Sequence, residues 1–144
     1  MRKLVLIGSL ALVGGGMLAM PAVASFDHHF TVIGIFKNGD QTDRGFEFRE
    51  KLVRPHNHRD KVGHNHVLCR AATGEHNRSK CKGRFHLNGE LGGEGEIRVR
   101  GNFGPGDHRL QVVGGGGDFN GVAGKLLIRD ESGRKTREHF DLTR

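Results

Sequence analysis

From Ser25 to the end of the chain, short runs with an apolar residue at every second position alternate with segments rich in Gly, Asp or Asn. A period of two places successive side chains on opposite faces of an extended strand, and the intervening segments are typical of turns. No stretch combines helical periodicity with helix caps. The sequence therefore predicts eight strands and no helix, at approximately 28–36, 44–53, 62–70, 82–88, 94–101, 108–114, 121–129 and 135–143.

Eight short strands joined by short connections fit a single all-β domain, either a closed antiparallel barrel or a sandwich. A closed barrel has no exposed strand edges, which are otherwise sites of aggregation. The interior of an eight-stranded barrel is just wide enough for packed side chains or for one small ligand. The pattern therefore predicts a compact core that either is filled or encloses a small cavity.

The first residues of the chain have the features of a secretory signal peptide. Two cations precede the uncharged apolar run 4–20, and Ala22-Val23-Ala24 supplies the pattern that signal peptidase reads, which predicts a cut between Ala24 and Ser25. A retained membrane anchor is the alternative, disfavoured by the glycines within the run and by its short length. We expect an exported protein of the cell envelope or extracellular space, with one domain at 25–144 and no membrane insertion after cleavage.

Charge restricts the partners of this domain. The chain has 23 Lys and Arg against 16 Asp and Glu, a net charge of +7, and removal of two cations with the signal leaves 7 − 2 = +5. A basic exported protein can contact anionic cell wall, lipid head groups or nucleic acid. The cations are interleaved with acids, however, and aromatic residues do not alternate with them. A solvated basic surface is the preferred interpretation, and no nucleic-acid partner is expected.

Two acidic residues interrupt the apolar face of their strands. Alternation places Glu50 on the inward face with Phe46 and Phe48, and Glu138 on the inward face with Phe140. A buried carboxyl group in an apolar cavity can act as a general acid or base or can orient a ligand. A bulge that turns Glu50 outward, or a rim position, is the alternative. For Glu138, near the start of its strand, a rim position in contact with water is the preferred interpretation.

Cys69 and Cys81 lie 12 residues apart around a polar loop and can form one disulfide in an oxidising compartment. A catalytic thiol is the competing interpretation. If the two cysteines are bonded across neighbouring strands, Cys81 shares an inward face with Phe85. Asn65 and Cys69 then face inward, while His64 and His66 face outward.

Four segments resemble a known family. Residues 61–69 are similar to the Val-Gly-to-Leu-Cys strand of allene oxide cyclases, and residues 95–101 to their Gly-x-Ile-x-Val-x-Gly strand. Residues 112–124 resemble the glycine-rich turn, Gly-Gly-(Thr/Ala)-Gly-x-Phe-x-Gly-Ala-x-Gly, that these cyclases share with dirigent proteins. With the closing His-Phe-Asp-Leu at 139–142, the likeness extends over nearly all of residues 30–142.

The resemblance implies an eight-stranded antiparallel barrel, commonly trimeric, with an apolar cavity that steers a small reactive molecule without a redox cofactor. Glu50 stands where the cyclases have a cavity Asn, in a Phe-x-Asn-Lys-Leu motif, and Cys69 matches their cavity cysteine. Gly34 and Phe36 replace the Glu and Asn of their first-strand Val-x-Glu-x-Asn segment. A carboxylate moved to Glu50 would support a different chemistry, or the cavity would merely bind its ligand.

These observations predict a barrel that binds a small apolar molecule and guides its cyclisation or isomerisation, without a cofactor. Glu50 is the candidate acid or base, Asn65 the candidate orienting group, and the candidate ligand contacts are Phe46, Phe48, Cys69 and Glu138. A non-catalytic binding or surface protein, with its barrel filled by the nine Phe side chains, is the first alternative. A histidine-rich metal binder is the second, although no third ligand follows the His pairs at a recognisable spacing, and no metal site is assigned.

Overall fold

The computed structural model describes residues 27–71, 78–104 and 108–144. The predicted signal peptide and its cut lie outside the described residues. The described chain forms eight strands in sequence order, β1 (Asp27–Thr42), β2 (Gly45–Arg54), β3 (Asn57–Ala71), β4 (Ser79–Asn88), β5 (Glu94–Phe103), β6 (Arg109–Gly117), β7 (Ala123–Glu131) and β8 (Lys135–Thr143). Within these ranges, no helix has the length and apolar character needed to cross a membrane.

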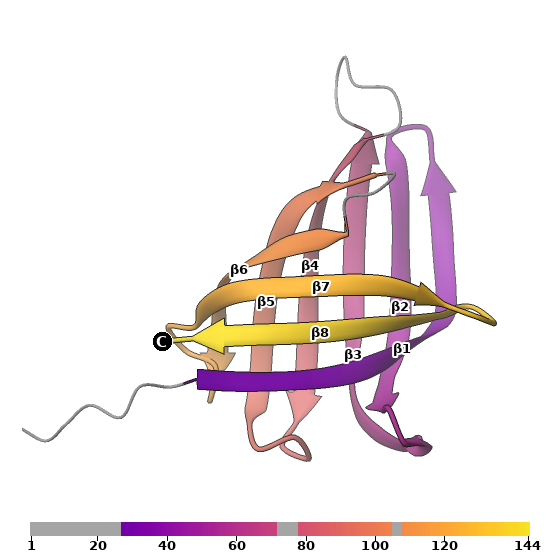
Figure 1. Cartoon of the computed structure of the whole chain (residues 1–144). Coiled ribbons are helices and arrows are strands. Elements are labelled where there is room, and N and C mark those ends of the chain that lie inside the picture. Colours follow the sequence, from indigo (N-terminus) through magenta and orange to yellow (C-terminus); the bar gives the residue numbers. More distant parts are fainter. Residues whose placement is uncertain (1–26, 72–77, 105–107) are drawn as a thin grey trace, which may run out of the picture.

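The strands form a closed barrel in which every strand pairs antiparallel with its neighbours in sequence. The barrel closes because β1 pairs with β8 along its first part, from Asp27 to Ile35, and with β2 from Ile33 to Thr42. Figure 1 shows the result, with β7, β8 and the start of β1 crossing steeply over β2 to β5. The predicted all-β barrel is confirmed, and the sandwich alternative is wrong.

The first and third strands are longer than their apolar patterns predict. β1 continues from Phe36 to Thr42 through polar residues, which pair with β2 down to Thr42 opposite Gly45. The register shifts between Phe36 and Asn38, so that one extra residue is accommodated on β1. Backbone hydrogen bonding extends this hairpin without any apolar alternation. It lengthens one end of the barrel beyond the core.

The opposite end of the barrel is filled by the glycine-rich turn. Phe119, which is 1% exposed, lies against Gly93, where a Cβ atom would stand 2.8 Å from its ring. A Cβ atom at Gly115 would lie 2.3 Å from the carbonyl oxygen of Phe119, so the turn needs glycine at this close approach. Asp118 also accepts a hydrogen bond from the backbone of Glu94, at 2.9 Å. These contacts close the end of the barrel around a buried phenyl ring.

The middle of the barrel is packed with aliphatic and aromatic side chains. Phe85 and Phe140 are fully buried and meet edge to face, with their ring centroids 5.1 Å apart. Phe30 also stacks on Phe140, with the ring centroids 4.8 Å apart. The inward face predicted for the fifth, seventh and eighth strands is confirmed by the buried side chains of Ile97, Val99, Val122, Leu126, Ile128, Phe140 and Leu142.

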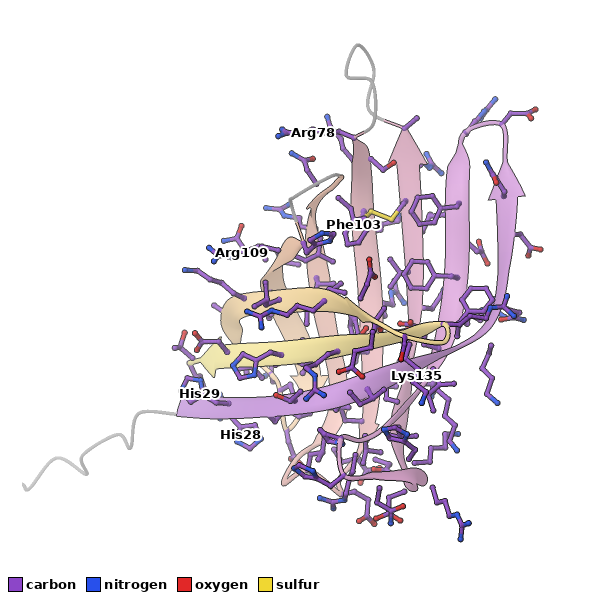
Figure 2. The ribbon with its side chains drawn as sticks, turned by 45° about the vertical axis from the view of Figure 1, so that its right-hand side comes forward. His28, His29, Arg78, Phe103, Arg109 and Lys135 are labelled. Atoms are coloured by element: carbon purple, nitrogen blue, oxygen red, sulfur yellow. A yellow bond between two sulfur atoms is a disulfide. The ribbon has the colours of Figure 1, made fainter. Side chains whose placement is uncertain are left out.

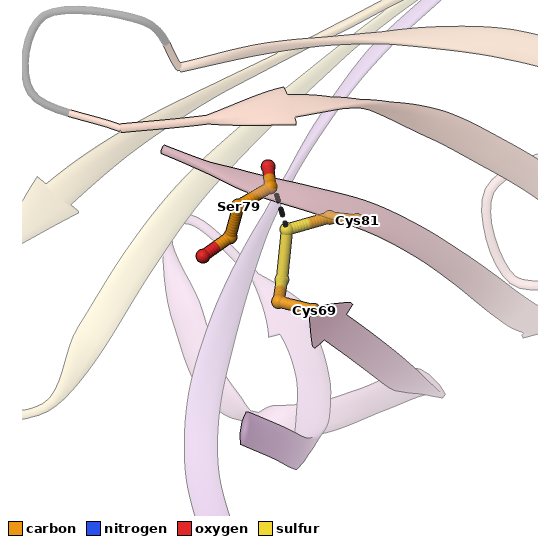
Figure 3. Close-up of a disulfide and its surroundings, with 3 residues drawn as sticks. All are labelled: Cys69, Ser79 and Cys81. Carbon is orange, nitrogen blue, oxygen red and sulfur yellow. Dashed lines mark hydrogen bonds between the residues drawn. A yellow bond between two sulfur atoms is a disulfide. The ribbon is translucent and has the colours of Figure 1, made fainter. Parts of the chain in front are cut away.

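Cys69 on β3 and Cys81 on β4 stand directly opposite each other and are joined by a disulfide (Figure 3). Their Cα atoms are 4.1 Å apart, and both side chains are buried. The predicted bridge is confirmed, and a free catalytic thiol is excluded at both positions. The Cys81 sulfur also lies 3.9 Å from the carbonyl oxygen of Ser79. Because the sulfur is in a disulfide and has no proton, this is a van der Waals contact. The bridge joins the two strands next to the loop between them.

Candidate functional site

A cavity of about 530 Å³ lies at the end of the barrel formed by the β1–β2 hairpin and the β7–β8 turn. This volume is within the range typical of small-molecule sites. Its walls include four phenyl rings, those of Phe36, Phe46, Phe48 and Phe103. Phe103 and Lys135, both labelled in Figure 2, line it from β5 and from the start of β8. The eight Phe side chains that the structure describes are therefore divided between a filled core and an open cavity.

The mouth of the cavity holds one cation over an aromatic wall. The guanidinium of Arg134 lies 4.7 Å from the centroid of the Phe36 ring, at a distance typical of a cation–π contact. Arg134 is in the β7–β8 turn and has a positive φ of 61°, the left-handed conformation that a tight turn requires. Phe36 in turn covers Gly39, where a Cβ atom would lie 3.1 Å from the ring. The turn and the hairpin thus define the entrance together.

Glu50 lies at the base of the cavity and is 4% exposed. One carboxyl oxygen accepts a hydrogen bond from the side-chain amide of Asn65, at 2.6 Å, and the other from the hydroxyl of Thr136, at 3.1 Å. The Asn65 side-chain oxygen accepts from the backbone N–H of Glu50, at 3.0 Å, which fixes the orientation of the amide. Both oxygens of Glu50 therefore act as acceptors, as a carboxylate requires. The predicted inward position of Glu50 is correct. A bulge at Glu50, the alternative considered from the sequence, is not found, because the register shift of the β1–β2 hairpin lies between Phe36 and Asn38 on β1.

Glu138 is also buried, at 1% exposed, so the rim position preferred from the sequence is wrong. Its neighbours on β1 and β7 are Val32 and Ile128, both buried, which cover it although it is only three residues into its strand. One of its oxygens accepts a hydrogen bond from the Asn65 amide, at 3.2 Å. Its Oε2 atom has no hydrogen-bond partner among the described residues.

The environment of Glu138 favours its neutral form. Burial raises the pKa of Glu138 well above its ordinary value, and the nearby charge of Glu50 raises it further, while the hydrogen bond from Asn65 opposes both effects. The charge of Glu50 acts on Glu138 through space, while Glu138 Oε2 itself has no hydrogen-bond partner among the described residues. The protonated form of Glu138 is therefore favoured next to a group that accepts hydrogen bonds on both oxygens.

The absence of a side chain at Gly34 makes room for this network. A Cβ atom at Gly34 would lie 2.5 Å from the Thr136 hydroxyl and 2.8 Å from the carboxyl carbon of Glu50. The sequence places Gly34 where the resembling cyclases have their first-strand Glu. In this chain the Glu50 carboxyl reaches the space beside position 34 from the neighbouring strand.

The structure brings most of the predicted site residues together. Phe46, Phe48 and Glu50 line the cavity, and Asn65 and Glu138 form the hydrogen-bonded layer behind Glu50. Cys69, expected among the ligand contacts, is bonded to Cys81 and is not among the lining residues. The lining residues missed from the sequence include Phe36, Phe103, Arg134 and Thr136. Period-two alternation on the eighth strand would have placed Thr136 on the face of Glu138.

His64 and His66 lie on the outer face of β3, as the predicted register requires. His64 stacks on His86, with centroids 4.9 Å apart, and His86 lies 3.4 Å from the carboxylate of Glu96. Partial burial and the neighbouring charges of His86 and Lys61 lower the pKa of His64. No group of three or more His, Cys, Asp or Glu side chains is placed to hold a metal ion within the described parts of the chain.

The fold is that of the barrels found in dirigent proteins and allene oxide cyclases. Among solved structures, the chain is similar to a protein titled pyocyanin demethylase, with a TM-score of 0.64, 18% identity, and coverage of 81% of this chain and 100% of that one. It is also similar to a pterocarpan synthase dirigent protein, with a TM-score of 0.57, 12% identity, and coverage of 82% and 94%. At these identities the likeness concerns the fold alone. No family model and no curated protein matches the sequence.

Proposed function

We propose that the protein binds a small, largely apolar molecule in this cavity and guides its isomerisation or cyclisation, with Glu50 as acid and base. The observation that carries the proposal is a buried carboxyl group at the base of a phenyl-lined cavity of ligand size. Apolar walls bind and orient a ligand, and Glu50 itself is shielded from water. A carboxyl group oriented by two donors is suited to exchange a proton with such a ligand.

The proposed chemistry needs no redox partner. Glu50 takes a proton from a carbon or oxygen atom of the ligand and returns it at another position, so that the bonds change and the atoms balance. Thr136 and Asn65 hold the carboxyl group in place during both steps. The raised pKa of Glu138 disfavours a second negative charge beside Glu50. The layer behind Glu50 thus supports a single working carboxylate.

The neighbours in structure support a role in small-molecule chemistry without assigning one. Their names refer to pyocyanin and to pterocarpan synthesis, and neither activity is carried over at such low identity. Export is part of the proposal, supported by the predicted signal peptide and by the disulfide, which forms in oxidising compartments. A trimer remains a prediction from the family resemblance.

The test uses residues 25–144, purified and incubated with extract of the native culture, after which retained compounds are identified by mass spectrometry. Each retained compound, with pyocyanin as an added probe, is then titrated against wild type, Phe48→Ala, Glu50→Gln and the control Val113→Ala on the outer face. We expect Phe48→Ala to weaken binding about tenfold or more, since it removes a wall of the cavity. Val113→Ala is expected to bind as wild type does.

Proton transfer is tested separately from binding. A bound compound is incubated with the protein in heavy water, and deuterium incorporation is followed by mass spectrometry. We expect incorporation with wild type and Val113→Ala, and a loss of about a hundredfold with Glu50→Gln, the scale of general base catalysis. Binding that Phe48→Ala leaves unchanged would contradict the proposed site. If wild type and Glu50→Gln bind the compound equally and neither incorporates deuterium, the protein is a non-catalytic binding protein and the proposed catalytic role of Glu50 is wrong.

A further inference from the structure

The outer face of β3, β4 and β5 carries three pairs of cations set directly opposite each other across neighbouring strands. Arg70 stands opposite Lys80, Lys82 opposite Arg100, and Arg84 opposite Arg98. All six side chains are exposed. We call these six residues the cation ladder. The alternation of acids and bases along the sequence conceals it, because the ladder arises from register between strands.

Such pairs oppose folding. Residues directly opposite on one face of an antiparallel pair have Cβ atoms roughly 5 Å apart, and like charges there are destabilising. Among the described residues, Arg98 alone of the six has a carboxylate partner, Glu96 at 3.8 Å. On β7 and β8, a like-charge pair of the same kind has a nearby carboxylate. Arg137 lies opposite Arg129 but donates a hydrogen bond to Glu131.

The ladder borders a groove of about 520 Å³, with a small apolar margin. Lys82, Arg84, Arg98 and Arg100 line it, together with Leu68 and Val113. Val113 is 44% exposed, and no other large hydrophobic side chain among the described residues is exposed. A groove lined by four Lys and Arg side chains and by the aliphatic side chains of Leu68, Val99 and Val113 complements an anionic chain. It offers too little apolar surface to insert into a bilayer.

We propose that the cation ladder binds a flexible linear polyanion whose negative charges are phosphate groups. A flexible chain can place one anion near each pair along the strands, where two residues span about 7 Å. Each bound phosphate releases counterions and relieves a like-charge pair, so binding and stability increase together. Nucleic acid fits less well, because the chain has no Trp or Tyr and the ladder contains no Phe on which bases would stack. The inference is independent of the proposed function of the cavity.

The test measures the affinity of residues 25–144 for inorganic polyphosphate of defined length, over a range of salt concentrations. Wild type is compared with the triple variant Lys82→Gln/Arg84→Gln/Arg100→Gln. The control triple variant Lys37→Gln/Lys125→Gln/Arg129→Gln loses the same charge from exposed positions outside the ladder. Single-stranded DNA and vesicles containing an anionic phospholipid are measured alongside.

We expect the ladder variant to lose about tenfold or more in affinity, and its salt slope to fall by about two. The control variant is expected to stay within about twofold of wild type, because specific contacts outweigh net charge. Melting temperatures provide a folding check, since the ladder variant relieves like-charge pairs and is expected to melt no lower than wild type. Equal losses in both variants, or tighter binding to DNA or vesicles than to polyphosphate, would overturn the proposal.

Discussion

The carboxyl group of Glu50 occupies the space beside Gly34, where a Cβ atom would stand 2.8 Å from the carboxyl carbon. The same Cβ atom would lie 2.5 Å from the hydroxyl of Thr136, which is hydrogen-bonded to Glu50. Position 34 and the buried acid are therefore linked, since the acid can point inward only while the neighbouring strand has no side chain there. This relationship leads to a direct test by substitution.

Gly34→Ala is expected to lower the free energy of unfolding by about 1–3 kcal/mol, because the added methyl group forces Glu50 and Thr136 to shift. Gly116→Ala is the matched control, since a Cβ atom there meets nothing within 4 Å. The control is expected to change stability by about 0.5 kcal/mol or less. Urea denaturation measures both. An equal effect of the two substitutions would show that the space beside Gly34 is not restricted.

Asn65 is predicted to contribute strongly to stability, because its amide donates hydrogen bonds to both buried carboxyl groups. Asn65→Ala leaves oxygens of Glu50 and Glu138 without a donor and is expected to cost about 3 kcal/mol. Asn102→Ala, at an exposed position on β5, serves as the control and is expected to be nearly neutral. Thermal and urea unfolding of the two variants give the comparison. A cost for Asn65→Ala as small as that of the control would refute the bridging role.

The disulfide is expected to stabilise the folded barrel by about 3 kcal/mol, since it restricts the unfolded chain around a 12-residue separation. The double variant Cys69→Ser/Cys81→Ser, measured by urea denaturation, is predicted to lose that amount. Mass spectrometry of wild type before and after reduction is predicted to show a gain of two hydrogens. Alkylation of the untreated folded protein at either cysteine would argue against the bridge.

Stability is expected to depend on pH through Glu138. Its pKa is raised in the folded state above the ordinary value of 4.5, so the folded state binds more protons than the unfolded state above that pH. The associated stability is fully present below about 4.5 and is lost as the pH rises through the folded pKa, with a slope of up to about 1.4 kcal/mol per pH unit. Glu138→Gln removes this slope. Parallel stability curves for wild type and Glu138→Gln would contradict the shift.

Alternation of apolar and polar residues was sufficient to predict the eight strands and the inward position of Glu50, whereas the choice of a barrel over a sandwich came from the family resemblance. The cysteines then set the register that turns Asn65 inward, and the disulfide and burial of Asn65 confirm it. Such inferences succeed because a period of two and a fixed cross-strand pairing restrict each side chain to one of two faces. Such inferences are limited to one strand or to one pair of neighbouring strands.

The parts that were missed depend on how several strands meet. Glu138 was interpreted as a rim residue from its place near the start of β8, but burial is decided by the neighbouring strands, which extend past it and cover it with Val32 and Ile128. The extension of β1 through polar residues has no apolar signal, and Arg134 reaches Phe36 from a turn. The cation ladder was hidden for the same reason, because it exists only across strands.

The most direct test of the site is the protonation state of its buried carboxyl pair at neutral pH. Carboxyl groups are observed by ¹³C NMR of protein labelled at glutamate, with Glu138→Gln and Glu50→Gln used for assignment. The network described here predicts one protonated carboxyl resonance in wild type at pH 7, assigned to Glu138 and absent from Glu138→Gln. A spectrum in which Glu50 and Glu138 are both ionised at that pH would contradict it.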